Sequence, residues 1–357
     1  MHHRQENCFM TIPYRVRRGL RRFFTAAGIL TLIAALALII WMLWLSRYVI
    51  YTDDGAKLDF SLAFGQSQGE IATPPASRPT VPISFVNDDG LPDTPDNALT
   101  QLSGYVISTE MLTDRLDDVK AALKTIPAGS AVMLDVKNYR GEFFYTSSLG
   151  RNPANMDTEA ITELIRELNS RGHHVIARIP AFRDFWYFID DEATRVPYGL
   201  PKAGGSGSLW EDKSVKNMTH YWFNPVSNGT LNYLVQIVTE LRSLGFDEVL
   251  FSDFRFPNTE DIRFEGDKTA ALNKAAKTLV QACASDTFTV SFVGNHFTLP
   301  EGRCRIYMEN TAAGDIPGIL ASVDASDAAA QLVFLTDLMD TRYEDYGVLR
   351  PVELLMD

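Results

Sequence analysis

Charged side chains gather at the ends of four apolar segments that have the character of buried strands. Residues two apart on a strand share a face, so Asp135 should lie beside Lys137, and Asp253 beside Arg255. An unpaired charge inside a protein costs several kcal/mol, so these groups must neutralise one another or meet a ligand. We predict a polar-ligand site, with a buried salt-bridge lattice as the alternative. The strand-end residues are Asp135 and Lys137; Arg178 with Arg183 and Asp184 just beyond it; Asp253 and Arg255; and Glu309 and Asn310.

The carboxyl groups of such a site could act as acid and base, or as oxygen ligands of a metal. The cations Lys137 and Arg255 beside them would compete with a metal for the same carboxylates, so no metal and no other cofactor is expected. Aromatic residues fall in the long connection between the third and fourth strands, where a barrel builds its substrate walls. They would suit sugar rings, or they could form a satellite core: Trp186, Tyr187, Trp210, Tyr221 and Trp222.

Strand-like and amphipathic helical segments alternate from about residue 102 onward, as in parallel sheets joined by right-handed crossovers. The helical pattern is clearest in residues 158–171, which begin after the N-cap residue Asp157, and in residues 230–244. We predict a (β/α)8 TIM barrel, with an open doubly wound α/β sheet as the alternative. Seven strands are visible, at residues 104–109, 131–137, 174–179, 248–255, 288–293, 304–309 and 331–336. An eighth strand could lie in residues 348–356 or earlier in the chain, or the barrel could be incomplete.

The N-terminal part predicts a membrane anchor. Residues 26–45 carry no charge, and a helix of that length spans about 30 Å, the hydrocarbon thickness of a bilayer. Arginines on the N-terminal side predict a cytoplasmic N-terminus and an extracellular C-terminal domain at the cell membrane. The expected organisation is a basic N-terminus (1–25), a transmembrane anchor (26–46), a stalk with short strands (47–100) and the barrel (101–357).

The charge and motifs exclude several classes of protein. The formal net charge is −12 although the N-terminus is basic, so the outer domain is strongly acidic and should repel nucleic acid. A neutral or cationic partner is expected. No dinucleotide fingerprint, Walker loop or G-x-S-x-G elbow is present. Cys283 and Cys304 could form a disulfide in an oxidising compartment.

Five sequence pieces resemble a known family, the glycoside-hydrolase-like barrel domains of bacterial membrane-anchored and secreted envelope proteins. The pieces span residues 102–257: Gly104-Tyr105, DVKNYRGEFFY from Asp135, ARIPAFRD from Ala177, YWFNP from Tyr221 and GFDEVLFSDFRFP from Gly245. The resemblance implies a TIM barrel that hydrolyses a polysaccharide or cell-wall glycan. The chain departs from the family in the fourth strand, where Ser252 stands in place of an aspartate and the carboxylate follows at Asp253. A slip of one residue turns a strand side chain to the opposite face unless a bulge compensates.

Glycosidic hydrolysis ordinarily needs one protonated and one ionised carboxyl group. Our hypothesis makes Asp253 the nucleophile or base and Glu309 the acid, with Asp135 as the alternative to either. The expected substrate-binding residues are Lys137, Arg178, Asp184, Trp210, Trp222, Asn224 and Arg255. The competing interpretation is a barrel without catalytic activity that is tethered to the membrane and binds carbohydrate or protein. A metal-dependent hydrolase using Asp135, Asp253 and Glu309 as ligands is a third, weaker one.

Overall fold

The computed structural model describes residues 98–356, except 155, 192–194, 206, 215–218, 295 and 324, and the backbone of residues 49–52 and 55–58. The predicted anchor and most of the predicted stalk lie outside the described residues. By its internal contacts the chain divides into two units, Met1–Ile83 and Ser84–Asp357. The first contains an antiparallel hairpin of β1 (Val49–Thr52) and β2 (Gly55–Leu58). Within the described part of the chain, no helix is long and apolar enough to cross a membrane.

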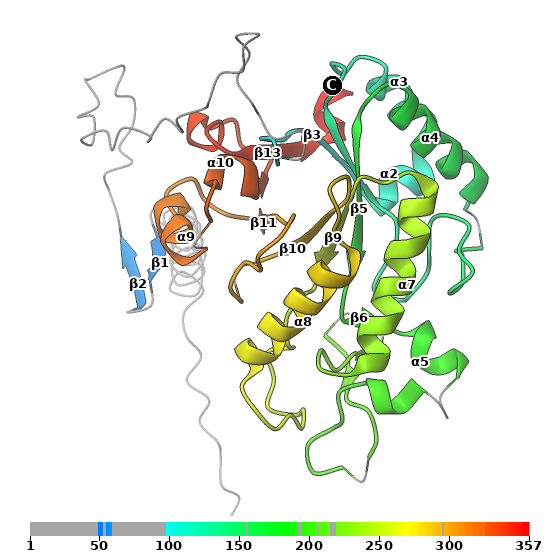
Figure 1. The fold of residues 1–357 in the computed structure, drawn as a ribbon, viewed down its shortest axis with the longest axis vertical. Helices are drawn as coiled ribbons and strands as arrows, with labels where there is room; N and C mark the ends of the chain where they lie inside the picture. Colours follow the sequence, from blue (N-terminus) through cyan, green and yellow to red (C-terminus); the bar gives the residue numbers. More distant parts are fainter. Residues whose placement is uncertain are drawn as a thin grey trace, which may run out of the picture. The chain divides into compact units, whose positions relative to one another are not determined.

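The second unit is built on a closed barrel of parallel strands, which confirms the predicted (β/α)8 fold (Figure 1). The eighth strand lies in the C-terminal tail, where β13 pairs with β12 on one side and with the first strand, β3, on the other. In order around the barrel the strands are β3 (Ser103–Ile107), β4 (Ala131–Asp135), β5 (His174–Pro180), β9 (Glu248–Ser252), β10 (Thr289–Val293), β11 (Ile306–Glu309), β12 (Leu332–Leu335) and β13 (Gly347–Pro351).

The helices follow the strands, and their ends are set by local sequence. Asp157 caps α4 by accepting a hydrogen bond from the Ala160 N–H, as predicted, and Asp267 caps α8 in the same way. Gly245 ends α7 in the left-handed conformation, at φ 96°. The helices are α2 (Thr109–Asp114), α3 (Leu116–Leu123), α4 (Thr158–Ser170), α5 (Trp186–Asp190), α7 (Asn228–Leu244), α8 (Lys268–Cys283), α9 (Ile316–Ser322) and α10 (Ala328–Gln331), with 3-10 turns η2 (Val196–Tyr198), η3 (Thr341–Tyr343) and η4 (Val352–Leu355).

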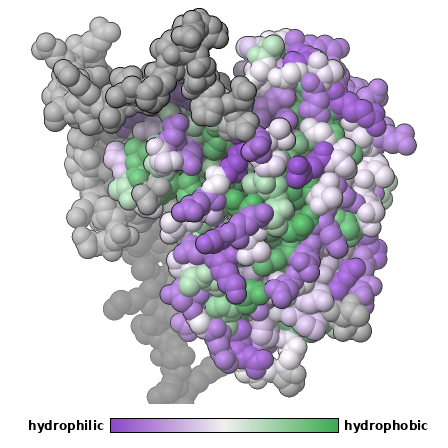
Figure 2. All heavy atoms as spheres, in the orientation of Figure 1, coloured by the Kyte–Doolittle hydropathy of each residue, from purple (hydrophilic) through white to green (hydrophobic). Residues whose placement is uncertain are grey.

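Apolar side chains fill both sides of the barrel wall. One buried cluster lies inside the barrel and includes Met133, Ile176 and Leu250. A larger cluster lies between the strands and the covering helices, and Figure 1 shows α4, α7 and α8 along the outside of the barrel. The described surface in Figure 2 is mainly hydrophilic, with hydrophobic residues showing in narrow strips. The strands are therefore buried on both faces, which explains their nearly continuous apolar sequences.

A second, small sheet lies in the long connection between β5 and β9. It consists of β6 (Arg183–Asp184), β7 (Glu211–Asp212) and β8 (His220–Trp222), with β8 in the middle and antiparallel pairing on both sides. The register pairs Arg183 with Trp222. This sheet carries two of the residues that the sequence assigns to substrate binding, Asp184 and Trp222.

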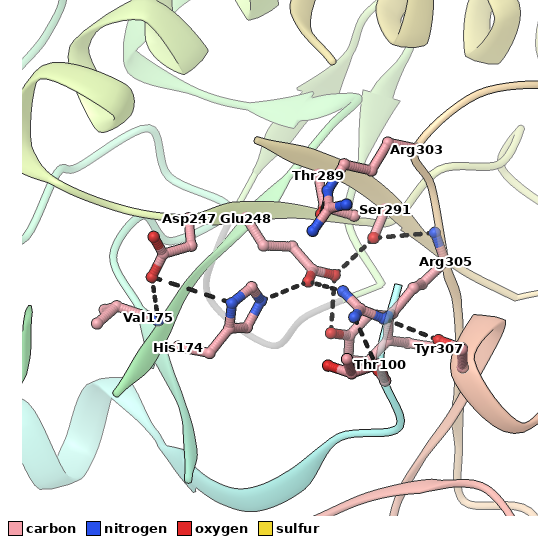
Figure 3. Close-up of polar contacts among 11 residues, drawn as sticks. Thr100, His174, Val175, Asp247, Glu248, Thr289, Ser291, Arg303, Arg305 and Tyr307 are labelled. Atoms are coloured by element: carbon pink, nitrogen blue, oxygen red, sulfur yellow. Dashed lines mark hydrogen bonds and ion pairs between the residues drawn. The ribbon is translucent and has the colours of Figure 1, made fainter. Parts of the chain in front are cut away.

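Glu248 is a fully buried carboxylate at the N-terminal end of β9 (Figure 3). It forms an ion pair with Arg305, whose side chain is 1% exposed, and it meets the His174 Nε2 at 2.9 Å. Ser291 and Tyr307 donate their hydroxyl hydrogens to it at 2.6 and 2.8 Å. The donors come from β5, from β10 and from the start of β11, so the network connects neighbouring strands of the barrel to β9.

The guanidinium of Arg305 is also bound on its remaining sides. It donates to the backbone carbonyls of Ala330 and Thr100 at 2.9 and 3.0 Å. Burial alone would raise the pKa of the Glu248 carboxyl, but the charge of Arg305 and the contact with His174 outweigh it and lower the pKa to about 2. The ionised carboxylate is thus the form that the fold requires. Polar residues at this end of a TIM barrel serve stability rather than catalysis.

Cys283 and Cys304 are both buried and both free, so they form no disulfide in this structure. Burial raises the pKa of the Cys283 thiol to about 11 and that of Cys304 to about 12. Neither thiol is therefore activated at neutral pH.

Glu248→Gln should destabilise the barrel by about 3–5 kcal/mol, because it leaves the buried Arg305 guanidinium without its carboxylate. Urea unfolding measures this loss. The folded pKa of Glu248 lies below its ordinary value of 4.5, so its contribution is complete above that pH and disappears as the pH falls toward about 2. The stability difference between wild type and variant should therefore shrink over this range.

Asp118→Asn, which breaks an exposed ion pair with Arg115, is the control and should change stability by less than about 1 kcal/mol. A difference that does not depend on pH would contradict the assigned role.

Candidate active site

Strand alternation places three charged residues inside the C-terminal mouth of the barrel. Met133, Ile176 and Tyr307 belong to the interior cluster, and the residues two positions further along the same strands are Asp135, Arg178 and Glu309. Asp135 is also the register partner of Arg178 across β4 and β5. The end of the barrel where TIM-barrel enzymes have their active sites is thus lined by two carboxyl groups and a guanidinium.

Arg178 lies between the two carboxyl groups. Its Nε is 3.5 Å from the Asp135 Oδ1, and its Nη2 is 3.1 Å from the Glu309 Oε1. All three side chains are between 19% and 32% exposed, so this is a partly open ion triad rather than a buried lattice. Two carboxyl groups that contact one guanidinium must be close neighbours.

The environment of Asp135 favours its protonated form. Burial is the main cause that raises the pKa of its carboxyl group, and the negative charge of Glu309 raises it further. The charge of Arg178 and a backbone hydrogen bond at Thr109 oppose the shift without cancelling it. In catalytic pairs of carboxyl groups, the group with the raised pKa is the usual acid.

Asp253 reaches the mouth by an unusual backbone conformation. On β9 the inward positions are Glu248 and Leu250, so Ser252 occupies the next inward position. Asp253 follows the end of the strand with φ 49°, in the left-handed region that residues other than glycine rarely adopt. Both Ser252 and Asp253 line the same cavity. The left-handed turn therefore compensates for the one-residue displacement.

Two arginines hold the Asp253 carboxylate. Arg183 Nη1 lies 3.4 Å from one oxygen and Arg255 Nη2 lies 3.6 Å from the other. Arg255 also stands over the ring of Trp222, at 5.1 Å from its centroid. The predicted proximity of Asp253 and Arg255 is confirmed as an ion pair, but its cause is not strand alternation, because β9 ends at Ser252.

The Arg183 guanidinium also contacts two aromatic rings. It lies 5.1 Å from the ring centroid of Tyr139 and 5.3 Å from that of Trp222. The Trp222 indole donates to Asp212 at 2.8 Å, and Asp212 lies 3.9 Å from Arg183. The small sheet thus fixes the cation that binds Asp253.

Two cavities open at the mouth, and Arg178 lines both. The first, of about 230 Å³, contains Asp135 and Asp253 and is completed by Thr109, Lys137, Asn138, Tyr139, Pro180 and Ser252. The second, of about 370 Å³, contains Glu309 and is completed by Val106, Asn310, Leu335, Thr336, Asp337, Leu349 and Pro351. The three predicted catalytic carboxyl groups are therefore brought to one mouth, distributed over two adjoining cavities.

Lys137 and Asp184 form a buried ion pair, 2.7 Å apart with both side chains at most 1% exposed. Asp184 also accepts hydrogen bonds from the Tyr187 N–H and the Tyr233 hydroxyl. Gly141 packs directly against it, and a Cβ there would come within 1.9 Å of the carboxylate. Lys137 lines the cavity of Asp135, whereas Asp184 lines neither cavity and supports Lys137 from behind.

The predicted aromatic walls pack mainly against the protein. Trp222 is 2% exposed, and Trp210 is half-buried against the main core. Asn224 forms the turn before α7, where its side chain accepts from the Val226 N–H. These three residues line neither cavity. The observed packing of the two tryptophans fits the alternative in which they belong to a hydrophobic core. Contact of these three residues with substrate stays a prediction.

Sequence reasoning left several mouth residues out of the predicted site. Tyr139 and Asn138 follow β4, Thr109 follows β3, and Thr336 and Asp337 follow β12. The rule that found Asp135, applied to polar residues just after the other strand ends, would have indicated Thr109, Thr336 and Asp337. The position of Arg183 against Asp253 carries no such sequence pattern, because it depends on how the small sheet folds back.

Comparison with known proteins identifies the domain. Residues 105–290 match the model of a family described as "Putative glycosyl hydrolase domain". No curated protein matches the chain.

Solved structures share only a general likeness with the chain. A hypothetical protein from Ruminiclostridium thermocellum has 19% identity and a TM-score of 0.41, over 57% of this chain and 96% of that one. A Paenibacillus cycloisomaltooligosaccharide glucanotransferase has 11% identity and a TM-score of 0.48, over 67% of this chain and 39% of that one. Aspergillus fumigatus Ega3 has 10% identity and a TM-score of 0.42, over 72% of this chain and 94% of that one. At these values the likeness carries no weight for the reaction or the substrate.

The pKa of Asp135 should respond to its two charged neighbours in opposite directions. Glu309→Gln should lower it, because a negative charge is removed, and Arg178→Met should raise it, because a positive one is removed. A pH titration of the Asp135 carboxyl carbon by NMR measures both shifts. Glu163→Gln, on the outer helix α4, is the control and should leave the titration unchanged. Shifts of the same sign in the two variants would refute the triad.

Proposed function

We propose that this chain, which belongs to the family described as a glycosyl hydrolase domain, hydrolyses a glycosidic bond by acid and base catalysis with paired carboxyl groups. The observation that carries the proposal is the set of three carboxyl groups around Arg178 and the neighbouring arginines at the C-terminal mouth of a closed barrel. The fold alone does not support a particular reaction, since TIM barrels catalyse many reactions.

Asp135 is the proton donor in this mechanism. Its raised pKa keeps a proton available for the leaving oxygen when the glycosidic C–O bond breaks. Our sequence-based hypothesis gave this role to Glu309 and kept Asp135 as the alternative. The burial of Asp135 now favours Asp135, while Glu309 contributes the negative charge that helps it retain the proton.

Asp253 is the nucleophile or base. It lines the same cavity as Asp135, and Arg183 and Arg255 hold its carboxylate in place. Acting as base, it would take a proton from water while the water oxygen bonds to the anomeric carbon. Acting as nucleophile, it would first form a glycosyl ester that water then hydrolyses. In the first route Asp135 ends ionised and Asp253 protonated, and proton exchange with solvent restores both groups. In the second route the ionised Asp135 takes the proton of the water that hydrolyses the ester, which frees the Asp253 carboxylate. Either route consumes one water.

The substrate that fits the sequence is an extracellular or cell-envelope polysaccharide. The predicted anchor at residues 26–46 would hold the barrel outside the cell membrane, within reach of such a glycan. The acidic charge of the chain favours a neutral or cationic glycan and disfavours nucleic acid. Arg178, which lines this cavity and is partly exposed, offers guanidinium donors to sugar hydroxyl groups.

A tethered binding barrel without catalytic activity is the second candidate. The observation in its favour is Ser252, which replaces the family's aspartate at the inward position of β9. Such a barrel would keep the two cavities and bind glycan without cleaving it. The two candidates differ in whether product appears, so one assay separates them.

Asp135→Asn and Asp253→Asn should each lower the rate of glycan hydrolysis by about 10²- to 10⁴-fold, the usual contribution of an acid–base group. The release of reducing ends from a panel of envelope glycans measures it. Because the acid must be protonated, wild-type activity should fall as the pH rises through the pKa of Asp135, and Asp135→Asn should remove this basic limb. Asp117→Asn, exposed at the start of α3, is the control.

The outcomes of this assay are distinct. Hydrolysis that survives both substitutions would refute the assignment of the carboxyl groups. Binding of a glycan without any hydrolysis by the wild-type chain would favour the second candidate.

A further inference from the structure

The cavity on the Glu309 side of Arg178 has the chemistry of a sugar subsite. Its lining combines the polar side chains of Glu309, Asn310 and Asp337 with the apolar side chains of Val106, Leu335, Leu349 and Pro351. A sugar ring combines the same two properties, since its hydroxyl groups lie around the edge and its C–H groups on the faces. Glu309 and Asp337 add acceptors for hydroxyl or ammonium hydrogens.

This cavity adjoins the cavity of Asp135 and Asp253. Arg178 is part of both linings, so the two cavities have its side chain in common. Ligand pockets usually measure about 300–1,000 Å³. The cavity of about 230 Å³ falls below this range and that of about 370 Å³ lies near its lower end, whereas the two together lie well inside it. The volumes thus suit one ligand that extends across both.

Asn310 gives an independent indication. It follows the end of β11 with φ 51°, a left-handed conformation that glycine would adopt without strain. Asn310 is exposed and lines the cavity, and its amide makes no hydrogen bond to another residue in the described ranges. Asp253 has the same conformation after β9. At both strand ends a polar side chain is thus turned into a cavity at the cost of backbone strain.

We infer that the cavity of Glu309, Asn310 and Asp337 is a second sugar-binding subsite, and that the substrate is therefore an oligosaccharide chain of at least two residues lying across Arg178. This inference rests on the proposed glycosidase function and adds the position of the second sugar. Asp135 contacts the dividing guanidinium, so it stands where the bridging oxygen between the two sugars would lie. The leaving sugar then occupies the second subsite, with the Asn310 amide bound to one of its hydroxyl groups.

The test measures binding by calorimetry with the full-length chain carrying Asp135→Asn, so that bound sugars are not consumed. The probes are α- and β-linked oligomers of glucose, galactose, glucosamine and N-acetylglucosamine, one to five residues long. For the linkage that binds, affinity should rise by at least about tenfold from one residue to two. Adding Asn310→Gly should weaken the longer ligands by about 2- to 10-fold and leave the monosaccharide unaffected.

Stability provides a second readout. Asn310→Gly relieves a left-handed conformation, so the midpoint of urea unfolding should stay constant or rise while affinity for the longer ligands falls. Asn258→Gly makes the same chemical change at an exposed residue that lines neither cavity, and it should not alter affinity.

The possible failures are distinguishable. Affinity that does not depend on chain length, or that survives Asn310→Gly, would overturn the second subsite and leave the proposed function standing. If no oligomer binds at any length, both the proposed function and the subsite are rejected.

Discussion

A charge that points into a closed barrel must be neutralised inside it, and this constraint shapes both ends of the structure. At the N-terminal end Glu248 is completely enclosed, and Arg305, His174 and two hydroxyl groups satisfy it. At the C-terminal end Arg178 meets two carboxyl groups, and all three remain partly exposed. The same alternation of side chains along parallel strands thus produces a structural ion pair at one end and an accessible triad at the other.

The difference between the two ends follows from how many partners each charge has. The Glu248 carboxylate accepts hydrogen bonds at both oxygens, so it has no capacity left for a ligand. The Oδ1 of Asp135 and the Oε1 of Glu309 have only the ionic contact with Arg178 and no hydrogen bond of good geometry within the described structure. Buried oxygens without a full set of donors cost free energy in the folded state, so these two carboxyl groups are less fully satisfied than Glu248.

The displaced carboxylate at Asp253 shows how a local backbone conformation can preserve a site. A regular strand would leave Ser252 at the mouth and turn Asp253 away from it. The left-handed turn, the ion pairs with Arg183 and Arg255 and the aromatic contacts of Arg183 together hold the carboxylate at the cavity. The small sheet, which brings Arg183 and Trp222 into register, is therefore a support for the site rather than a wall of it.

The sequence by itself determined the alternation of strands and helices and the charged residues at the strand ends, because periodicity and turn chemistry are local properties. Closure of the barrel was decided by the pairing of β13 with β3, which joins the two ends of the domain. Asp135, Arg178 and Glu309 could be predicted to meet because parallel strands end at one edge. Only the tertiary structure decided that Asp184 serves Lys137 from behind, that Trp222 is buried, and that Asp253 reaches the mouth. These outcomes depend on contacts between distant segments and on a left-handed backbone angle, and no periodic pattern in the sequence predicts either of them.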